Sequence, residues 1–526
     1  MSLFQLLVHT ATACNVEAPL PQFHVGHGPG TGPRDPNALF QYMGVWHLMY
    51  QANWTDWAHI VSADLVRWTR LPSALAPRGD WDGTLTIIDG KPVILYDCNA
   101  VADCLPPSHP DGSPNDHSIV GVARPADYND PNLTHWLKDP RNPIAILNGR
   151  PGAGPSNLWQ VAGKINMLMA QGKHGPVARY ETDDPSLHNW TVAQPYPFWS
   201  NTGGGVEIFH PLPRRVGAVG EVAPSDDAVG DEAVSEAAPQ KKTVPTHMLG
   251  HVSAPPHAAG TPWFKLGRYH DAIGIFDPIA DAPVSLDSSE LVVFSAVSVT
   301  DSRMLHIAWF NGNGTSNTLT VPREISYEQS TRRLLALPVA ELSTLRGAVL
   351  GSLGKPIAIP PNAQLSIFNG SAASRTFDLE VDVALPANGA ALSFGVAVMA
   401  VAGSREDAEV LLIIDVSAAA ASGAPRIVNM SSSVSGALPK AYPFTFYNSS
   451  VSFPLPASEE RFTLRVLADN SIVEAFAADG RGVITTPVAA PGKRPHRATV
   501  TVFAMADAAV TLHAATAWTM GCGWAG

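Results

Sequence analysis

The stretch Gly32–Gln51, GPRDPNALFQYMGVWHLMYQ, joins a proline-bounded turn to a strand that is rich in aromatic residues. The carboxylate of Asp35 lies in the turn, and the strand runs from Trp46 to Gln51. Aromatic rings stack on the apolar faces of sugars, and a carboxylate can attack or stabilise an anomeric carbon. The pattern therefore fits sugar chemistry, although Asp-Pro-Asn alone is typical of an ordinary turn.

The rest of the chain has the texture of an all-β protein. Short apolar or alternating segments are separated by turn residues, and the chain holds 46 prolines and 43 glycines. Helical periodicity is confined to a short connector candidate, Val339–Leu345. Spacing alone leaves a propeller, a large sandwich and a barrel open. The strands expected with the clearest pattern are Trp46–Gln51, Pro92–Tyr96, Ile165–Ala170, Leu291–Ala296 and Leu305–Phe310.

Length and composition limit the classes of function. The chain has 526 residues, which indicates two domains, and 45% hydrophobic with 15% charged residues indicates a well-packed globular protein. A net charge of −12 argues against nucleic acid and anionic membrane as partners. It is compatible with a neutral small-molecule or oligosaccharide substrate. The longest apolar run, over 390–402, is too short to span a bilayer and is expected to be a buried strand.

Cysteines and sequons bear on the compartment without deciding it. Cys98 and Cys104 could close a small disulfide loop or stay as two free thiols. The apolar segment 3–13 has only a weak likeness to a signal peptide, because it is short and lacks a basic region. Localisation and oligomeric state stay open, with a lean to a secreted or vacuolar protein. That lean rests on seven N-x-Ser/Thr sequons, which begin at Asn53, Asn132, Asn189, Asn313, Asn369, Asn429 and Asn448.

Two further features suggest no additional chemistry. His24, His27, His47 and His59 lack the helical spacing and flanking carboxylates of a metal site, so we expect neither metal nor cofactor. Residues 213–245 are low in complexity and acidic, which is typical of a disordered surface insertion.

Several motifs together resemble glycoside hydrolase family 32, the invertases, inulinases and fructan-active enzymes. The family's Trp-Met-Asn-Asp-Pro-Asn-Gly turn is similar to Gly32–Ala38, and its following strand is similar to Trp46–Gln51. Matches continue in family order from about residue 22 to about residue 505, through Ser62–Trp68, Val321–Glu324, Leu337–Arg346 and Asp469–Phe476. The resemblance implies a five-bladed β-propeller over 20–347, followed by a C-terminal β-sandwich over 365–520.

The resemblance also implies catalytic roles. Asp35 matches the nucleophile of the family. The family's Arg-Asp-Pro motif, whose aspartate binds sugar hydroxyls, aligns with Ala153, Gly154 and Pro155, so this third carboxylate is missing. Loss of one positioned group that stabilises the transition state costs several kcal/mol.

The acid/base residue is open between two alignments. One alignment of the family's Trp-Glu-Cys-Pro-Asp-Phe motif with 202–209 makes Glu207 the acid/base, and the other leaves Gly204 in that position. We favour Glu207, because it is the only carboxylate in that segment. An ordinary strand-edge glutamate is the alternative.

Four further residues match sugar-contacting positions: Asn37, Gln51, Trp57 and Trp159. Asn37 and Gln51 can hydrogen-bond hydroxyls, and the tryptophans can stack; turn formation and core packing are the alternatives. Arg34 replaces the family's asparagine before the nucleophile, and 85–88 replaces its Phe-Ser-Gly-Ser segment.

These observations predict a β-fructofuranosidase-like glycoside hydrolase that acts on sucrose or fructan by a retaining double displacement. The alternative is a weakened or inactive member of the family that serves as a carbohydrate-binding or interaction module. The sequence does not separate sucrose from fructan, or hydrolysis from fructosyl transfer.

Overall fold

The structure is a computed structural model. It describes residues 20–26, 32–52, 56–76, 82–98, 104, 118–147, 154–170, 176–198, 204–212, 245–253, 263–279, 285–289, 292–300, 303–311, 317–368, 375–400, 408–420, 423–435, 449–488, 499–505 and 508–524. The expected acidic insertion, 213–245, lies outside these residues except for Pro245.

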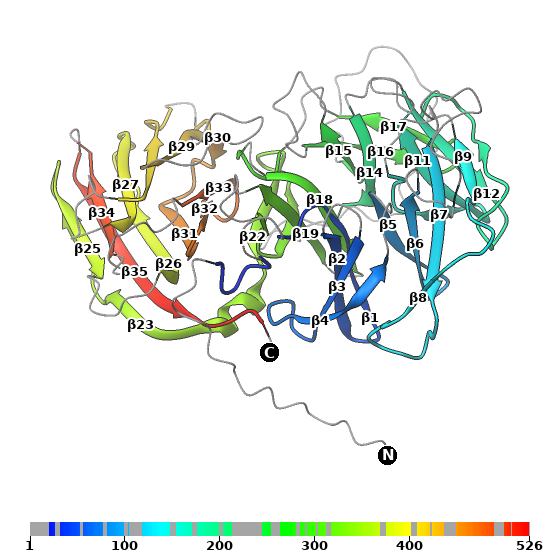
Figure 1. The fold of residues 1–526 in the computed structure, drawn as a ribbon. Helices are drawn as coiled ribbons and strands as arrows, with labels where there is room; N and C mark the ends of the chain where they lie inside the picture. Colours follow the sequence, from blue (N-terminus) through cyan, green and yellow to red (C-terminus); the bar gives the residue numbers. More distant parts are fainter. Residues whose placement is uncertain are drawn as a thin grey trace, which may run out of the picture.

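The N-terminal domain is a five-bladed β-propeller, as expected, and each blade is an antiparallel sheet whose strands follow chain order (Figure 1). Blade 1 consists of β1 (Pro36–Tyr42), β2 (Val45–Ala52), β3 (Asp56–Ser62) and β4 (Thr69–Leu75). Blade 2 consists of β5 (Gly83–Ile88), β6 (Lys91–Asp97), β7 (Ser118–Pro125), β8 (Trp136–Lys138) and β9 (Ala145–Leu147). Blade 3 consists of β10 (Trp159–Val161), β11 (Lys164–Ala170), β12 (Val177–Thr182) and β13 (Thr191–Val192).

Blade 4 consists of β14 (Gly204–Pro211), β15 (His247–Ser253), β16 (Trp263–His270) and β17 (Ile275–Pro278). Blade 5 consists of β18 (Val292–Val299), β19 (Met304–Asn311), β20 (Asn317–Leu319), β21 (Arg323–Glu328) and β22 (Arg333–Pro338). The five strands expected from sequence fall within β2, β6, β11, β18 and β19, apart from Leu291, which is outside the described residues.

The first strands of the blades surround the propeller axis. A narrow cavity is lined by residues of β1, β5, β14 and β18, among them Asn37, Gly83, Ile208 and Ala296. Since these strands each open a blade that is built outward from the axis, their N-terminal ends meet at one end of the cavity. Residues that directly precede a blade are therefore brought together, although they are far apart in sequence.

A tight hairpin fixes the register of blade 1. Met43 and Gly44 connect β1 to β2 with positive φ angles of 47° and 83°, which match the twist of the paired strands. Leu48 and Met49 of β2 are fully buried, so the strand that carries Gln51 is held by packing on both faces. The sequence GVWHLMYQ therefore forms a rigid support for the turn that precedes β1.

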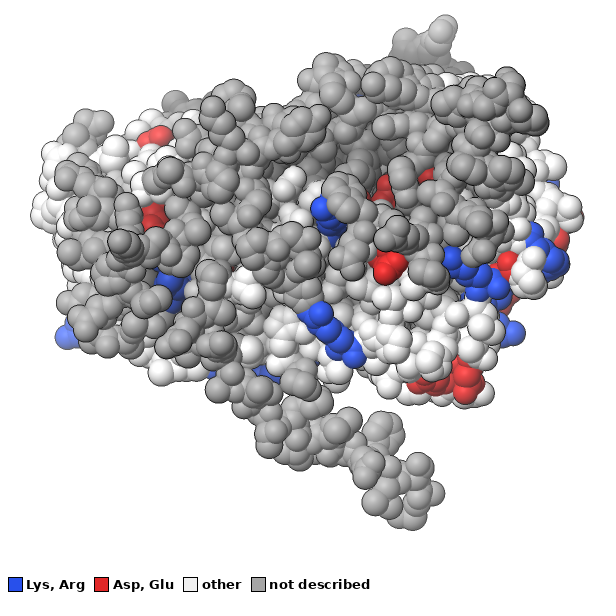
Figure 2. Space-filling view, viewed as in Figure 1, with Lys and Arg blue, Asp and Glu red and all other residues white. Residues whose placement is uncertain are grey.

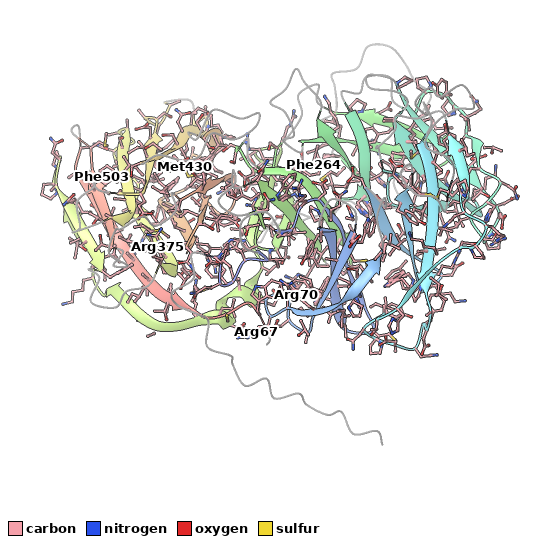
Figure 3. All side chains as sticks on the ribbon, in the orientation of Figure 1. Arg67, Arg70, Phe264, Arg375, Met430 and Phe503 are labelled. Atoms are coloured by element: carbon pink, nitrogen blue, oxygen red, sulfur yellow. A yellow bond between two sulfur atoms is a disulfide. The ribbon has the colours of Figure 1, made fainter. Side chains whose placement is uncertain are left out.

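The C-terminal domain is a β-sandwich of two antiparallel sheets. One sheet contains β23 (Arg346–Leu353), β24 (Ile357–Ile359), β26 (Thr376–Ala384), β31 (Arg461–Asp469), β32 (Ile472–Ala477), β33 (Gly482–Pro487) and β35 (Val510–Met520). The other contains β25 (Gln364–Phe368), β27 (Leu392–Ala400), β28 (Val410–Val416), β29 (Arg426–Val434), β30 (Ser450–Leu455) and β34 (Thr499–Ala504). Figure 3 places Met430 and Phe503 in this domain and Phe264 in the propeller.

The sandwich begins earlier in the chain than expected. A 3-10 helix, η1 (Ala340–Leu345), confirms the predicted connector, and β23 then pairs with β35 from Arg346 onward. β23 and β24 thus belong to the sandwich although they precede the expected boundary at 365. The buried strand predicted over 390–402 is confirmed, since that run contains β27. β31 and β32 form a hairpin turned at Asn470 and Ser471.

A buried charge network joins the two domains. Glu474 of β32 accepts hydrogen bonds from Arg323 of β21 (2.6 Å) and from the Val321 backbone (2.8 Å), and its other neighbour is the His24 ring (2.9 Å). The second nitrogen of the His24 ring lies 2.8 Å from Asp469. Arg323, His24, Asp469 and Glu474 all have fully buried side chains. The Asp469–Phe476 motif therefore locks the sandwich and the N-terminal segment onto blade 5.

The C-terminus returns to the propeller at a second junction. The Trp68 backbone donates to the Gly523 carbonyl (2.8 Å), and the Arg70 guanidinium lies 4.9 Å from the centre of the Trp524 ring. Arg67 donates to the Thr344 carbonyl of η1 (3.0 Å). Figure 3 shows Arg67 and Arg70 at this seam between the domains.

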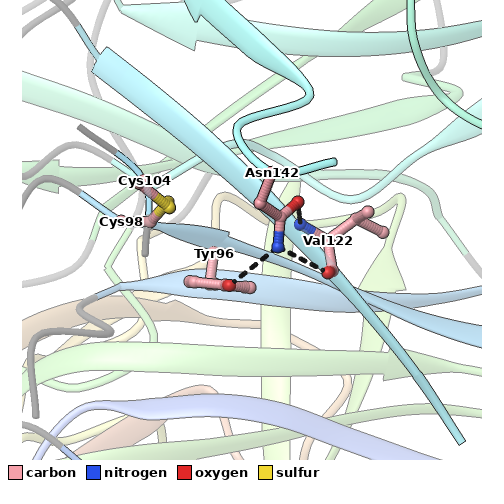
Figure 4. The surroundings of a disulfide bond; sticks show 5 residues. All are labelled: Tyr96, Cys98, Cys104, Val122 and Asn142. Carbon is pink, nitrogen blue, oxygen red and sulfur yellow. Dashed lines mark hydrogen bonds between the residues drawn. A yellow bond between two sulfur atoms is a disulfide. The ribbon is translucent and has the colours of Figure 1, made fainter. Parts of the chain in front are cut away.

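A disulfide closes a loop at the end of blade 2. Cys98 and Cys104 are bonded, and beside them Asn142 holds β7 by exchanging two hydrogen bonds with Val122 and donating to the Tyr96 hydroxyl (Figure 4). Of the two alternatives for these cysteines, a disulfide or two free thiols, the structure contains the disulfide.

We expect the Cys98→Ala/Cys104→Ala double variant to lose about 2 kcal/mol of unfolding free energy, because the bond closes a short loop in the unfolded chain. Urea unfolding of the variant and the parent protein measures the difference. Substitution is the cleaner test, since Cys522 is also disulfide-bonded and a reductant would open both bonds. An unchanged midpoint would show that the bond contributes nothing to folding.

The surface in Figure 2 carries basic and acidic side chains that are interspersed over the described residues of that face.

Within the described ranges, no helix has the length and apolar character that crossing a membrane would require. Over the same ranges, no group of three His, Cys, Asp or Glu side chains could hold a metal ion.

Candidate active site

Asp35 directly precedes β1 at the end of the propeller axis. The turn is fixed onto β2 by two backbone hydrogen bonds: the Arg34 N–H donates to the Gln51 carbonyl (3.0 Å), and the Gln51 N–H donates to the Asp35 carbonyl (2.9 Å). The Asp35 residue is half-buried. Its position, next to the axis and held by a rigid strand, suits a group that must meet a substrate in one fixed orientation.

Arg34 lies on the other side of the turn, toward blade 5. Its guanidinium carbon is 5.9 Å from the centre of the Trp309 ring. Burial lowers the pKa of Arg34, and the neighbouring Asp35 carboxylate acts in the opposite direction. A cation therefore stands beside Asp35 where the family has a neutral asparagine.

Asn37 lies in an irregularity of β1. The pairing with β2 shifts register between Pro36 and Ala38, which is the signature of a β-bulge at Asn37. The residue is 8% exposed and lines the axial cavity with Gly83. Its Nδ2 atom has no hydrogen-bond partner among the described residues. Buried amide groups are rarely left this way, so the nitrogen is available to a ligand.

Gln51 connects Asp35 to a carboxylate that the sequence analysis missed. The Gln51 side chain, 5% exposed, donates through Nε2 to Oδ1 of Asp82. Asp82 is 8% exposed and directly precedes β5, the first strand of blade 2. The segment Trp81–Thr84 has the aromatic-x-Gly-hydroxyl pattern of the family's Phe-Ser-Gly-Ser. That pattern was the available signal, and it fits better than the segment 85–88.

Trp57 forms the support beneath these polar residues. It pairs with Gln51 across β2 and β3, and its side chain is fully buried. Its ring lies against β5, since a Cβ atom placed on Gly83 would be 3.0 Å from the Trp57 Cζ2 atom. The structure thus places Trp57 in packing contact under the site, and its stacking on a sugar stays a prediction.

Gly154 aligns with the family's third carboxylate, and it packs against the start of β5. A Cβ atom at this position would be 2.8 Å from the Gly83 nitrogen and 2.9 Å from the Asp82 carbonyl carbon. Real Cβ atoms do not approach backbone this closely, so only glycine fits here. The absence of an aspartate at 154 is therefore built into the packing between blades 2 and 3.

Glu207 lies in β14, the first strand of blade 4. The pairing of β14 with β15 shifts register between Val206 and Ile208, which places Glu207 at the irregularity. Bulges are common beside active sites because they redirect a side chain. Two residues on, Phe209 exchanges backbone hydrogen bonds with the Asn157 side chain (2.6 and 2.7 Å). The Glu207 side chain itself is outside the described part of the structure.

Trp159 packs in an aromatic cluster between blades 3 and 4. Its ring centre lies 4.8 Å from that of Phe209 and 6.1 Å from that of Tyr269. The residue is half-buried, and its predicted contact with substrate stays a prediction. In this structure it helps to hold β14, and thereby Glu207, in place.

The buried histidines divide into two kinds. The His47 and His59 rings lie 2.9 Å apart between their nearest nitrogens, and burial lowers their pKa values to about 4 and about 3. Burial also lowers the pKa of His210, beside the axial cavity, to about 4. His24 is the opposite case. Burial acts to lower its pKa, but its hydrogen bonds to Asp469 and Glu474 outweigh burial and raise the pKa to about 9. His27 is outside the described residues.

A five-bladed propeller that carries carboxylates directly before β1 and β5 and is joined to a β-sandwich can present carboxyl groups of the kind that glycoside hydrolysis requires. The family signatures agree with this class. The Glycosyl hydrolases family 32 N-terminal domain matches residues 33–223, and the family 32 C-terminal domain matches residues 341–519. The chain belongs to glycosyl hydrolase family 32.

Individual relatives are distant but collinear with this chain. It is 25% identical to the beta-fructofuranosidase, insoluble isoenzyme 1, of Daucus carota, over 92% of this chain and 86% of the carrot protein. It is 26% identical to the sucrose:sucrose 1-fructosyltransferase of Festuca arundinacea, over 86% of this chain and 72% of that protein.

Solved structures share the fold. Fructan 1-exohydrolase IIa from Cichorium intybus superposes with a TM-score of 0.76 at 21% identity, covering 96% of this chain and 98% of the chicory chain. Exo-inulinase from Aspergillus awamori superposes with a TM-score of 0.69 at 18% identity, covering 97% and 100%. The chicory structure contains 1-kestose.

Proposed function

We propose that this protein hydrolyses the β-fructosidic bond of sucrose or a fructan with retention of configuration. The observation that carries the proposal is the position of Asp35, fixed by Gln51 at the axis of a family 32 propeller. The relatives support the substrate class, since they include β-fructofuranosidases, a fructan 6-exohydrolase and a fructosyltransferase.

In this proposal Asp35 attacks the anomeric carbon of the fructosyl unit while Glu207 protonates the leaving oxygen. The fructosyl–enzyme ester is then hydrolysed by a water that Glu207 deprotonates. Asn37 and Gln51 hold ring hydroxyls, and their burial means that these hydrogen bonds form away from bulk water. Attack by a sugar hydroxyl in place of water would give fructosyl transfer from the same intermediate.

The test is fructose release from sucrose, 1-kestose and inulin by the purified protein. We expect release from at least one of them, with β-fructofuranose as the first anomer seen by NMR, because two displacements restore the configuration. Formation of longer oligosaccharides at high sucrose concentration would identify transfer. The α-anomer as first product would contradict the double displacement.

A weakened or inactive carbohydrate-binding member is the second candidate, and Gly154 is the observation that favours it. Its expected result is different: the folded protein would bind fructose or 1-kestose in calorimetry and release no fructose.

A further inference from the structure

Three of the N-x-Ser/Thr sequons lie within the described residues, and each presents an exposed asparagine: Asn132, Asn189 and Asn429. Asparagines outside sequons are not uniformly exposed, since Asn157 and Asn166 are 5% and 0% exposed. A folded protein can accommodate a bulky glycan only on an exposed side chain. The other sequons, which begin at Asn53, Asn313, Asn369 and Asn448, lie outside the described residues.

Asn132 and Asn189 belong to corresponding loops of neighbouring blades. Each loop joins the third strand of a blade to the fourth, β7 to β8 in blade 2 and β12 to β13 in blade 3. Both loops contain Asp-Pro, at Asp130 and Asp184, and each aspartate carboxylate accepts the backbone N–H two residues further on (2.9 and 2.8 Å). The two asparagines are therefore carried by turns of the same construction.

A buried leucine anchors each of these turns to its blade. Leu133 and Leu187 have positive φ angles of 47° and 65° and are 0% and 2% exposed. Their backbone N–H groups donate to the carbonyls of Asp130 and Asp184 (3.0 and 2.9 Å). Because the leucines fix the turns from inside, the exposed asparagines beside them can carry a large polar group without disturbing the core.

The side-chain amides are compatible with a sugar on Nδ2. The Asn132 side chain is exposed, and Nδ2 of Asn189 donates to the carboxylate of Asp184 (3.2 Å). An amide nitrogen carries two hydrogens. Replacement of one by a sugar therefore leaves the other for the hydrogen bond to Asp184.

The disulfides are an independent observation that points to the same modification. Cys98 is bonded to Cys104, and Cys522 is also disulfide-bonded. Disulfides form and persist in the secretory pathway and are rare in the cytosol. Sequons on the surface of a secreted protein are acceptors of N-linked glycans. The cysteines and the exposed sequons thus fit one compartment.

We infer that Asn132 and Asn189 carry N-linked glycans at the end of the propeller opposite Asp35. The third strand of each antiparallel blade runs parallel to the first, away from the end at which Asp35 precedes β1, so both loops lie at the far end. Arg124 at the end of β7 donates to the Ser186 carbonyl (3.0 Å), which places the two loops side by side. The inference does not depend on the proposed function.

The modification is a group transfer from a lipid pyrophosphate-linked oligosaccharide. The bond between Nδ2 and the anomeric carbon of the first sugar forms, and the bond between that carbon and the pyrophosphate oxygen breaks. The lipid pyrophosphate leaves with the electron pair of the broken bond, and Nδ2 loses one proton.

The test is peptide mapping, by mass spectrometry, of the full-length protein secreted from a eukaryotic host. Peptide N-glycosidase F converts a glycosylated asparagine into aspartate, so we expect aspartate at 132 and at 189 after treatment. An unmodified asparagine at both positions overturns the inference, and an unmodified asparagine at one overturns it for that position. Asn129 is the matched internal control, because it is exposed in the same loop and lies outside any sequon.

Variants at Thr134 separate loss of the glycan from misfolding. Thr134→Ala removes the sequon and leaves Asn132 intact, so the glycan at 132 should be lost. Thr134→Ser keeps both the sequon and a hydroxyl that can bond to Asp130 as the threonine hydroxyl does, so the glycan should be retained. Equal electrophoretic mobility of the two secreted variants would overturn the assignment of Asn132.

Discussion

Asp35→Asn should lower fructose release at least about 10³-fold, which corresponds to about 4 kcal/mol of lost transition-state stabilisation. Asparagine has the shape of aspartate and can keep the turn before β1, but its amide does not form the fructosyl ester. The backbone hydrogen bonds to Gln51 do not involve the side chain, so the fold should be retained. Steady-state rates and the unfolding midpoint, measured on the same preparation, test both statements.

The same assay assigns Glu207 when the leaving group is varied. Glu207→Gln should slow sucrose cleavage about 10²–10⁴-fold, which is the usual contribution of general acid–base catalysis. With a p-nitrophenyl fructoside, the leaving group needs no proton, so formation of the fructosyl–enzyme should be nearly unaffected and a burst of nitrophenol should appear. Asp35→Asn should show no burst with either substrate.

The control for these variants is Asp277→Asn. Asp277 is an aspartate of the outer strand β17 whose side chain is 66% exposed. The activity of the Asp277→Asn variant should equal that of the parent protein. An Asp35→Asn variant as active as Asp277→Asn would show that Asp35 is not the nucleophile.

Glu474→Gln should destabilise the protein by about 3 kcal/mol, the second large effect we expect. The substitution removes the carboxylate that Arg323 and His24 share, while Arg323 keeps its ion pair with Asp287 and His24 keeps its ion pair with Asp469. The loss is that of buried hydrogen bonds to a charged group, which are worth about 1.5–3 kcal/mol each. Because Glu474 joins the sandwich to blade 5, the loss should weaken the junction of both domains. Urea unfolding, followed by tryptophan fluorescence, measures it.

The matched control is Asp382→Asn on the same sheet of the sandwich. Asp382 pairs with Arg461 at 2.9 Å, but both side chains are more than 30% exposed, and exposed ion pairs contribute at most about 1 kcal/mol. A Glu474→Gln effect no larger than that of Asp382→Asn would contradict the role assigned to the buried network.

The free energy of unfolding should depend on pH through the two shifted pKa values in this network. The pKa of His24 is raised from 6.5 to about 9, so its contribution is full below 6.5 and is lost as pH rises through about 9. Burial acts to raise the pKa of Glu474, but Arg323 and His24 together outweigh it and lower the pKa to about 2, so the contribution of Glu474 is lost as pH falls from 4.5 through about 2. The difference between parent and Glu474→Gln should be largest between pH 4.5 and 6.5. A difference in unfolding free energy that is constant from pH 2 to 10 would contradict this pH dependence.

The local sequence was sufficient for the strands and for one member of the site. The strand Trp46–Gln51, the connector Val339–Leu345 and the proline-bounded position of Asp35 are set by neighbours in the chain, so they can be predicted from it. The two-domain division also followed from sequence, but the boundary did not. β23 and β24 join the sandwich only by pairing with β35, at the far end of the chain.

By itself the sequence determined an all-β chain of family 32 character, the nucleophile candidate Asp35 and the absence of an aspartate at 154. Only the tertiary structure decided that Gln51 meets Asp82, 31 residues away, and that His24 meets Glu474, 450 residues away. The physical reason for the first contact is the propeller architecture, because the strands of blades 1 and 2 pack side by side and the residue directly before β5 meets the end of β2. The reason for the second contact is the packing of the C-terminal sandwich on blade 5. Which carboxylates converge at the Asp35 end of the propeller depends on backbone packing such as that of Gly154 on Gly83, and this packing leaves no periodic signal in the sequence.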